Sequence, residues 1–307
     1  MSATVVEEKS ITKKGTGPVT KETYEHRIHA DWCPGCGDFS VLAALQAALG
    51  ELGLEPYNTV VVSGIGCSSN LPGYINCYGM HTLHGRSLAV ASGVKMANHS
   101  LNVIATGGDG DGYGIGNNHL VHCMRRNIDI TYIVMDNQIY GLTTGQCSPT
   151  SARGAKTKTT PNGNIENPYN PIAMAITGGA TYVARGYSAK PKHLIELIKA
   201  GIQHKGFSLI DVFSPCVTFN KENTYQWFNK RVKMLEESGH NPTDFHTAMD
   251  RAYEFTDDEG VPIGLFWKRD DLGSLDQLDP VCADGPVATR PTGLSKEQQA
   301  QLLKEIM

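Results

Sequence analysis

The stretch Val103-Ile104-Ala105-Thr106-Gly107-Gly108-Asp109-Gly110, with Asp136-Asn137 after 25 further residues, gives the clearest indication of the fold. An acidic residue follows one short apolar run, and a carboxamide follows the next run, at residues 130–135. If the two runs are neighbouring strands, Asp109 and Asn137 present oxygen atoms to one cation at one edge of a sheet. Magnesium prefers such a site, with few protein oxygens and the remaining positions taken by water and phosphate.

Short β-branched apolar runs alternate with helical patterns along most of the chain. The predicted strands are residues 58–63, 102–106, 130–135, 181–184 and 208–213. The predicted helices are residues 39–52, 87–99, 117–126, 171–177 and 191–204. This alternation is typical of an α/β fold, a parallel sheet with helices on both faces.

In a parallel sheet of this kind, ligands bind beyond the carboxyl ends of the strands. Residues 64–66, 108–110 and 136–137 each follow a predicted strand, and two of these loops are rich in glycine. Glycine lets the backbone approach a ligand closely. We therefore expect the three loops to converge on one edge and to form the functional site there.

The glycine-rich loop has competing interpretations. A phosphate-binding P-loop would require Gly-Lys-Ser/Thr, which is absent, and the dinucleotide fingerprint GxGxxG cannot be placed in any register. An EF-hand loop that began at Asp109 would put Tyr113 where an oxygen ligand is required. An ordinary turn stays possible, because Gly and Asp are common turn residues. The later residues Asn137, Tyr140 and Gly141 favour the metal site over the turn.

The pattern resembles the diphosphate-anchoring motif of thiamin diphosphate enzymes. In such a site Asp109 supplies a carboxylate oxygen, Asn137 a side-chain oxygen and Ile139 a backbone carbonyl to Mg²⁺. Two diphosphate oxygens and a water complete six positions. The helix predicted to begin near Gly116 would direct unpaired N–H groups at the same phosphates.

The cysteines form a second pattern. The motif CPGC at residues 33–36 is by itself compatible with half a zinc site, a redox pair or chance. No second CxxC occurs, and no clear strand precedes this one as in a thioredoxin-like motif. Cys67 and Cys216 each follow a predicted strand, at the edge already assigned to the cofactor. Four thiolates there suit zinc or a [4Fe–4S] cluster, and the spacing does not decide between them. We interpret the other cysteines as small, partly buried thiols: Cys77, Cys123, Cys147 and Cys282.

The composition of the 307-residue chain excludes several classes of protein. A net charge of −4 and a pI of about 6.3 indicate no general surface for nucleic acid or membrane. No apolar run approaches the roughly 18 residues that span a bilayer, and the N-terminal residues lack the apolar segment of a signal peptide. Eight cysteines without such a signal indicate thiols or metal ligands in a reducing cytoplasm.

The chain is long enough for one large core with extensions. We predict an N-terminal arm at residues 1–24, a cofactor-binding domain at residues 25–242 and a C-terminal arm at residues 243–307. Residues 143–169 are polar without periodicity, and we expect a loop at the mouth of the site. Residues 221–238 are predicted to be a helix. Residues 295–298 look like a capping box that opens a short final helix.

Taken together, the motifs resemble the thiamin-diphosphate-binding β subunit of 2-oxoacid:ferredoxin oxidoreductases. The resemblance covers about residues 25–235. The matching stretches are CPGCG at 33–37, GIGCS at 64–68, HTLHGR at 81–86, GDGD at 108–111 with DN at 136–137, YGLT at 140–143 and SPC at 214–216.

The resemblance implies a role for each matched residue. The expected ligands of one [4Fe–4S] cluster are Cys33, Cys36, Cys67 and Cys216. The expected magnesium ligands are Asp109, Asn137 and the carbonyl of Ile139. The expected thiamin contacts are Ile65, Gly66, Cys67, Ser68, His84, Gly110, Asp111, Gly141 and Leu142.

Two of the matched residues, His84 and Arg86, have other interpretations, and the residue after one matched stretch, Thr144, departs from the family pattern. His84 is equally compatible with a histidine packed at a helix start, and Arg86 with partner contacts or with solvation of the helix. The family often has a lysine after the threonine matched by Thr143, whereas this chain has Thr144. A cationic contact to the substrate, or to the subunit's own carboxylates, is therefore not expected at Thr144.

The resemblance also implies the reaction, the oxidative decarboxylation of a 2-oxoacid with transfer of the acyl group to coenzyme A and of electrons to ferredoxin. No catalytic residue is expected in this chain, because in the family the glutamate that activates thiamin belongs to another domain. We expect a larger α subunit to supply it, in a heterodimer or a dimer of heterodimers. The leading substrate is 2-oxoglutarate, followed by pyruvate. The alternatives are a non-redox thiamin lyase or synthase with a structural zinc site, and a zinc-stapled scaffold subunit.

Overall fold

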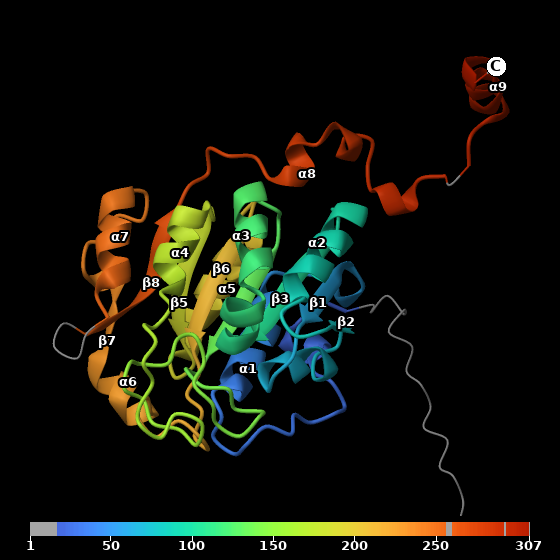
Figure 1. Ribbon diagram of the computed structural model, residues 1–307. Coiled ribbons are helices and arrows are strands. Elements are labelled where there is room, and N and C mark those ends of the chain that lie inside the picture. The colour runs from blue at the N-terminus through green and yellow to red at the C-terminus, as the bar shows by residue number, and fades with distance from the viewer. Residues whose placement is uncertain (1–16, 256–259, 292, 307) are drawn as a thin grey trace, which may run out of the picture.

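The protein is described by a computed structural model, which covers residues 17–255, 260–291 and 293–306 (Figure 1). These residues form one eight-stranded sheet in the order β2-β1-β3-β4-β6-β5-β8-β7. The strands are β1 (Thr59–Ser63), β2 (Tyr78–His81), β3 (Asn102–Gly108), β4 (Thr131–Asp136), β5 (Tyr182–Tyr187), β6 (Ser208–Phe213), β7 (Val232–Met234) and β8 (Val261–Lys268). The first six strands in the sheet order run parallel, and β8 is antiparallel to β5. The predicted α/β fold is confirmed.

Helices cover both faces of the sheet (Figure 1). One face packs against α1 (Asp38–Glu51) and α5 (Pro191–Gln203). The other face packs against α2 (Ser87–Ala97), α3 (Asn117–Arg126), α4 (Pro171–Gly178) and α7 (Phe245–Tyr253). Every residue of β1, β4, β5 and β6 is buried, as expected for parallel strands covered on both sides.

The remaining helical elements lie outside these two layers. They are α6 (Tyr225–Arg231), α8 (Leu275–Leu278), α9 (Lys296–Ile306), a π-helical segment (Gly110–Ile115) and short 3₁₀ turns at Lys21–Tyr24, Pro56–Asn58, Ser68–Gly73, Leu235–Glu237, Pro280–Cys282 and Val287–Thr289. The five predicted strands and five predicted helices all occur, with ends shifted by up to three residues. The predicted capping box at the start of α9 is present, because Ser295 N–H donates to the Gln298 side chain and Gln298 N–H donates to Ser295 Oγ.

Two predictions about the last third of the chain are wrong. Residues 221–238 are not one helix, because α6 ends at Arg231 and Val232–Met234 pairs with β8 as β7. The C-terminal arm does not begin at residue 243, because α7 and β8 complete the sheet domain with buried side chains such as Ala248 and Phe266. Both errors arise because the partner of each strand lies far away in the sequence.

Beyond Lys268 the chain leaves the sheet and runs along its amino edge to α9, which stands away from the body (Figure 1). No side chain of α9 is buried. At the other end, residues 1–16 of the predicted N-terminal arm lie outside the described residues, and Tyr24 is fully buried against α1.

Candidate functional site

Three loops meet at one edge of the sheet, as predicted. They follow β1, β3 and β4, which are adjacent parallel strands, and the registers place Ser63 beside Thr106 and Gly108 beside Met135. Residues 64–67, 109–116 and 137–142 therefore leave the sheet side by side. This edge is the lower one in Figure 1.

Asp109 is buried at this edge and faces a residue that the sequence motifs did not identify. The hydroxyl of Thr150 lies 2.6 Å from Asp109 Oδ2 and 2.8 Å from Asp136 Oδ1. Burial raises the pKa of Asp109 to about 6, and hydrogen bonds from Ser148 and Thr150 oppose that rise. A bound cation would favour the ionised carboxylate. Thr150 belongs to the loop predicted at the mouth of the site, and only its place in that polar loop indicated a role.

The loop after β4 is held by its own hydrogen bonds. The side-chain oxygen of Asn137 accepts the N–H of Ile139 at 3.0 Å, and Asn220 donates to the Asn137 carbonyl at 3.0 Å. Gln138 takes a left-handed conformation with φ of 59°, which turns the chain sharply. An amide oxygen has two lone pairs, so one stays available for a cation.

Asp111, in the loop after β3, joins the loop after β1 to the residues just before α2. Its Oδ1 atom accepts the N–H groups of Ile65 at 2.9 Å and Gly85 at 2.7 Å, and lies 2.8 Å from His84 Nδ1. A Cβ atom added at Gly64 would overlap its other oxygen. Asp111 is 2% exposed, whereas the His84 side chain is 39% exposed. In this geometry Asp111 contacts protein groups, and the imidazole of His84 is the accessible member of the pair.

Helix α3 begins at Asn117 with Gly116 as its N-cap, so the prediction that a helix begins near Gly116 is confirmed. Residues 110–115 form a π-helical segment before α3, with a kink at Gly114, whose backbone angles are not helical. Tyr140 donates to the Gly110 carbonyl at 3.0 Å, and a Cβ atom at Gly110 would overlap the Tyr140 ring. Glycine is thus required there by close packing. Single-turn π-helices occur frequently at functional sites.

A charged cluster lies in the core behind these loops. Asp211 Oδ2 accepts from Arg185 Nε at 3.0 Å and Oδ1 accepts from Tyr113 Oη at 2.8 Å. Burial raises the pKa of Asp136 well above its usual range, and the nearby carboxylates Asp211 and Asp109 raise it further. Sequence reasoning missed this cluster, because acids and a cation inside strands carry no motif.

The four expected cluster ligands line one cavity of about 270 Å³ at the same edge. A Cβ atom placed on Gly141 would lie 3.6 Å from Cys67 Sγ and 3.7 Å from Cys216 Sγ, so these two sulfurs face the loop after β4. Burial raises the pKa of Cys36, and it raises that of Cys67 to about 11. Because the thiolate is the metal ligand, metal binding here would displace protons. Among the described residues, no three His, Cys, Asp or Glu side chains are close enough to hold a single metal ion.

The other expected residues lie around this cavity and the Asp109 loop. Leu142 lines the cavity and is 55% exposed, and Ile65 is 37% exposed. Cys77, Cys123 and Cys282 are buried and Cys147 is half-buried, and all four are free thiols as interpreted from the sequence.

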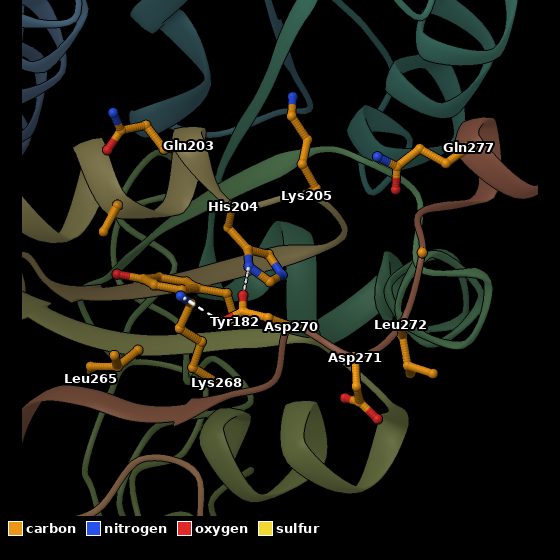
Figure 2. Close-up of a pocket in the computed structure, with 12 residues that line it drawn as sticks. Tyr182, Gln203, His204, Lys205, Leu265, Lys268, Asp270, Asp271, Leu272 and Gln277 are labelled. Atoms are coloured by element: carbon orange, nitrogen blue, oxygen red, sulfur yellow. Dashed lines mark ion pairs between the residues drawn. The ribbon is translucent and has the colours of Figure 1, made fainter.

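A larger cavity, of about 590 Å³, lies at the opposite edge of the sheet (Figure 2). Asp270 lines it and forms an ion pair with Lys268 at 2.8 Å, and His204 Nδ1 lies 3.6 Å from the Asp270 carboxyl group. It faces the amino ends of β5 and β6, where the C-terminal segment crosses the sheet edge. None of the expected cofactor residues lines it.

The fold and the site are those of a cofactor-binding α/β domain, and comparisons with known protein families show which class of domain it is. Residues 64–212 match the family described as "Thiamine pyrophosphate enzyme, C-terminal TPP binding domain". Residues 216–283 match the family that describes the C-terminal part of the pyruvate ferredoxin oxidoreductase beta subunit. The chain is thus built on a thiamin-diphosphate-binding domain.

Individual relatives identify the family. The chain is 47% identical over 253 residues to 2-oxoacid:ferredoxin oxidoreductase 1, subunit beta, of Aeropyrum pernix, covering 80% of each protein. It is 45% identical over 222 residues to 2-oxoglutarate synthase subunit KorB of Methanocaldococcus jannaschii, covering 72% of this chain and 82% of the relative. The chain belongs to the β subunits of the 2-oxoacid:ferredoxin oxidoreductases and is part of an enzyme.

A solved structure has the same architecture. It is 2-oxoglutarate:ferredoxin oxidoreductase from Magnetococcus marinus with 2-oxoglutarate, coenzyme A and succinyl-CoA bound. The TM-score is 0.84 at 41% identity, over 92% of this chain and 95% of that one. In the described part of the chain, no helix has the length and apolar character needed to cross a bilayer.

Proposed function

We propose that the chain is the β subunit of a cytoplasmic enzyme that oxidatively decarboxylates 2-oxoglutarate, with coenzyme A as acyl acceptor and ferredoxin as electron acceptor. The observation that carries the proposal is the placement of four cysteines around one cavity that adjoins the Asp109 edge. Cys67 belongs to both regions, because its loop also contains Ile65, which donates to Asp111. When bound, thiamin diphosphate would supply an electron sink for the loss of CO₂, and a [4Fe–4S] cluster would accept electrons.

The residues at the two sites fit these groups. Asp109, Asn137 and the Ile139 carbonyl offer hard oxygen atoms of the kind that Mg²⁺ prefers, and they follow adjacent strands. Cys33, Cys36, Cys67 and Cys216 would hold the cluster. Zinc would instead place the four sulfurs about 2.3 Å from one ion, so the metal content of the purified complex distinguishes the two groups.

The thiamin contacts are proposed on the same basis. Ile65, Gly66 and Ser68 lie on the loop after β1, Gly110 and Asp111 on the π-helix, and Gly141 and Leu142 on the loop after β4. Asp111 would order the first loop through the N–H of Ile65, and His84 would present its exposed ring to the cofactor. These groups would contact only one side of the cofactor. We therefore assign the activating glutamate to a larger α subunit, in a heterodimer or a dimer of heterodimers.

A second substrate, pyruvate, is favoured by one observation, the match of residues 216–283 to a pyruvate:ferredoxin oxidoreductase segment. The overall similarity to the Magnetococcus marinus enzyme favours 2-oxoglutarate. Thr144 lines the cysteine cavity with φ of 75°, a conformation that is strained for a β-branched residue. This position presents no cation to a substrate carboxylate.

The test is made on the αβ complex, purified without oxygen. We expect four irons per β chain, a broad visible absorption that bleaches on reduction, and ferredoxin reduction that is fastest with 2-oxoglutarate. Cys216→Ser should lose the cluster, whereas the matched control Cys147→Ser should keep it, because Cys147 lies against Thr160 instead. A colourless complex with one zinc, or full decarboxylation by the β chain alone, would contradict the proposal. If turnover is faster with pyruvate than with 2-oxoglutarate, pyruvate is the substrate of this enzyme.

A further inference from the structure

Trp32 connects the two cysteine segments of the cavity. Its indole Nε1–H donates to the Cys67 carbonyl at 2.6 Å, across 35 positions of sequence. Trp32 directly precedes Cys33, lines the cavity and is 7% exposed. The bond therefore joins the segment of Cys33 and Cys36 to the loop of Cys67.

The indole has little freedom to turn. Phe39 and Tyr74 meet its ring edge-to-face, with centroids 5.3 Å and 5.0 Å away and interplanar angles of 86° and 82°. Such pairs contribute beyond the area that they bury. Tyr74 is itself held by a hydrogen bond to Asp31, which also lines the cavity. These contacts fix the orientation of the indole ring, so its N–H points at the Cys67 carbonyl.

The accepting carbonyl controls how Cys67 is presented. Gly66 has φ of 139°, so the peptide before Cys67 turns in a way that side chains disfavour. The Cys67 carbonyl also accepts the N–H of Asn70 at 3.3 Å, at the start of the 3₁₀ turn. Two donors thus hold this peptide, and only Trp32 comes from another segment.

We propose that Trp32 is a positioning residue that holds Cys67 in place and keeps water from the cavity, and that it thereby sets the reduction potential of the iron–sulfur cluster. This assignment rests on the proposed function, because it concerns the cluster held by these cysteines. Groups that orient ligands and limit solvent access tune both the affinity and the potential of a metal centre. Reduction adds negative charge to the cluster, so admitting water stabilises the reduced state and makes the potential less negative.

The test replaces Trp32 by Phe, which removes the N–H and part of the ring. We expect Trp32→Phe to assemble the cluster, with a midpoint potential shifted to less negative values in an EPR-monitored titration. We expect cluster loss to a chelator to be about tenfold faster or more. Trp227→Phe is the matched control, because Trp227 packs on Phe228 away from the cavity and should leave both values unchanged.

A second variant keeps the test decisive if Trp32→Phe does not fold. Phe39→Leu retains the indole but removes one ring that holds it, and Phe39 is 37% exposed. We expect a smaller shift in the same direction. If the wild-type complex holds its cluster and both Trp32→Phe and Phe39→Leu show the wild-type potential and cluster retention, the role of Trp32 alone is overturned. A wild-type complex without iron would overturn the proposed function and this assignment with it.

Discussion

The hydroxyl of Thr150 lies 2.6 Å from Asp109 Oδ2, and the same oxygen lies 2.8 Å from Asp136 Oδ1. A hydroxyl has one hydrogen and can donate to only one of the two carboxyl groups. Burial and neighbouring carboxylates raise the pKa of Asp136 well above its usual range, so Asp136 is the group suited to carry a proton and donate to Thr150. The Thr150 hydrogen then points at Asp109.

This relationship makes Thr150 a testable support of the proposed cation site. Thr150→Val removes the hydrogen bond to Asp109 Oδ2 from this buried carboxylate, at a cost of about 1–3 kcal/mol in the free energy of unfolding. We expect Mg²⁺-dependent binding of thiamin diphosphate to weaken about tenfold or more. Calorimetric titration of the αβ complex with thiamin diphosphate in the presence of Mg²⁺ measures this affinity. Thr150→Ser keeps the hydroxyl and should bind as wild type, so equal binding by all three proteins would rule out this role.

Gly64 is predicted to tolerate no side chain. Its Cβ atom would overlap the Asp111 carboxylate, which the N–H groups of Ile65 and Gly85 hold in place. Gly64→Ala should therefore lower the free energy of unfolding by about 1–3 kcal/mol and impair cofactor binding. The control is Gly93→Ala in α2, where nothing lies within 4 Å of the added atom, and a helix should gain about 0.5–1 kcal/mol. Denaturant titration measures the free energy of unfolding of both variants. A Gly64→Ala variant as stable as the wild type would contradict the packing argument.

Tyr113 should contribute to stability through the buried Asp211. Tyr113→Phe removes the hydroxyl that donates to Asp211 Oδ1 and leaves that oxygen without a donor inside the core. The expected loss is about 1–3 kcal/mol of unfolding free energy. Tyr253, which is 67% exposed, provides the control, since Tyr253→Phe should change stability by less than about 0.5 kcal/mol. Equal losses in both variants would show that the Asp211 contact is not the cause.

His204 should make stability depend on pH. Burial lowers its pKa in the folded protein, with Asp270 opposing the shift (Figure 2). The unfolded chain, with a pKa of about 6.5, binds the proton more readily, so this residue's contribution is present above that pH and is lost as the pH falls through the folded pKa. His204→Gln can still donate to Thr181 and should weaken this dependence.

The measurement for His204 is the thermal midpoint of each protein at about pH 7.5 and about pH 5.5, on either side of the ordinary histidine pKa. The difference between the two midpoints should be smaller for His204→Gln than for wild type. His246 is exposed, so His246→Gln should retain the full wild-type difference. An unchanged difference in His204→Gln would disprove the role of His204.

The parts of the fold that were predicted correctly depend on local pattern. The apolar runs that became β1, β3, β4 and β6 are buried on both faces, so each is continuous in sequence and ends at a loop. The edge strand β2 was not predicted, because all four of its residues are exposed and carry no apolar period. β7 and β8 were not predicted, because their pairing joins residues about 30 positions apart and no local signal shows it.

By itself, the sequence determined the family, the parallel α/β architecture and the edge at which Asp109, Asn137 and the cysteine loops lie. It could do so because strand ends are local features and parallel strands place those ends together. Only the tertiary structure decided what surrounds these residues, because Thr150 on Asp109, Trp32 on Cys67 and Arg185 on Asp211 are contacts between segments distant in the chain. Their energies depend on burial and direction, which arise when the layers pack.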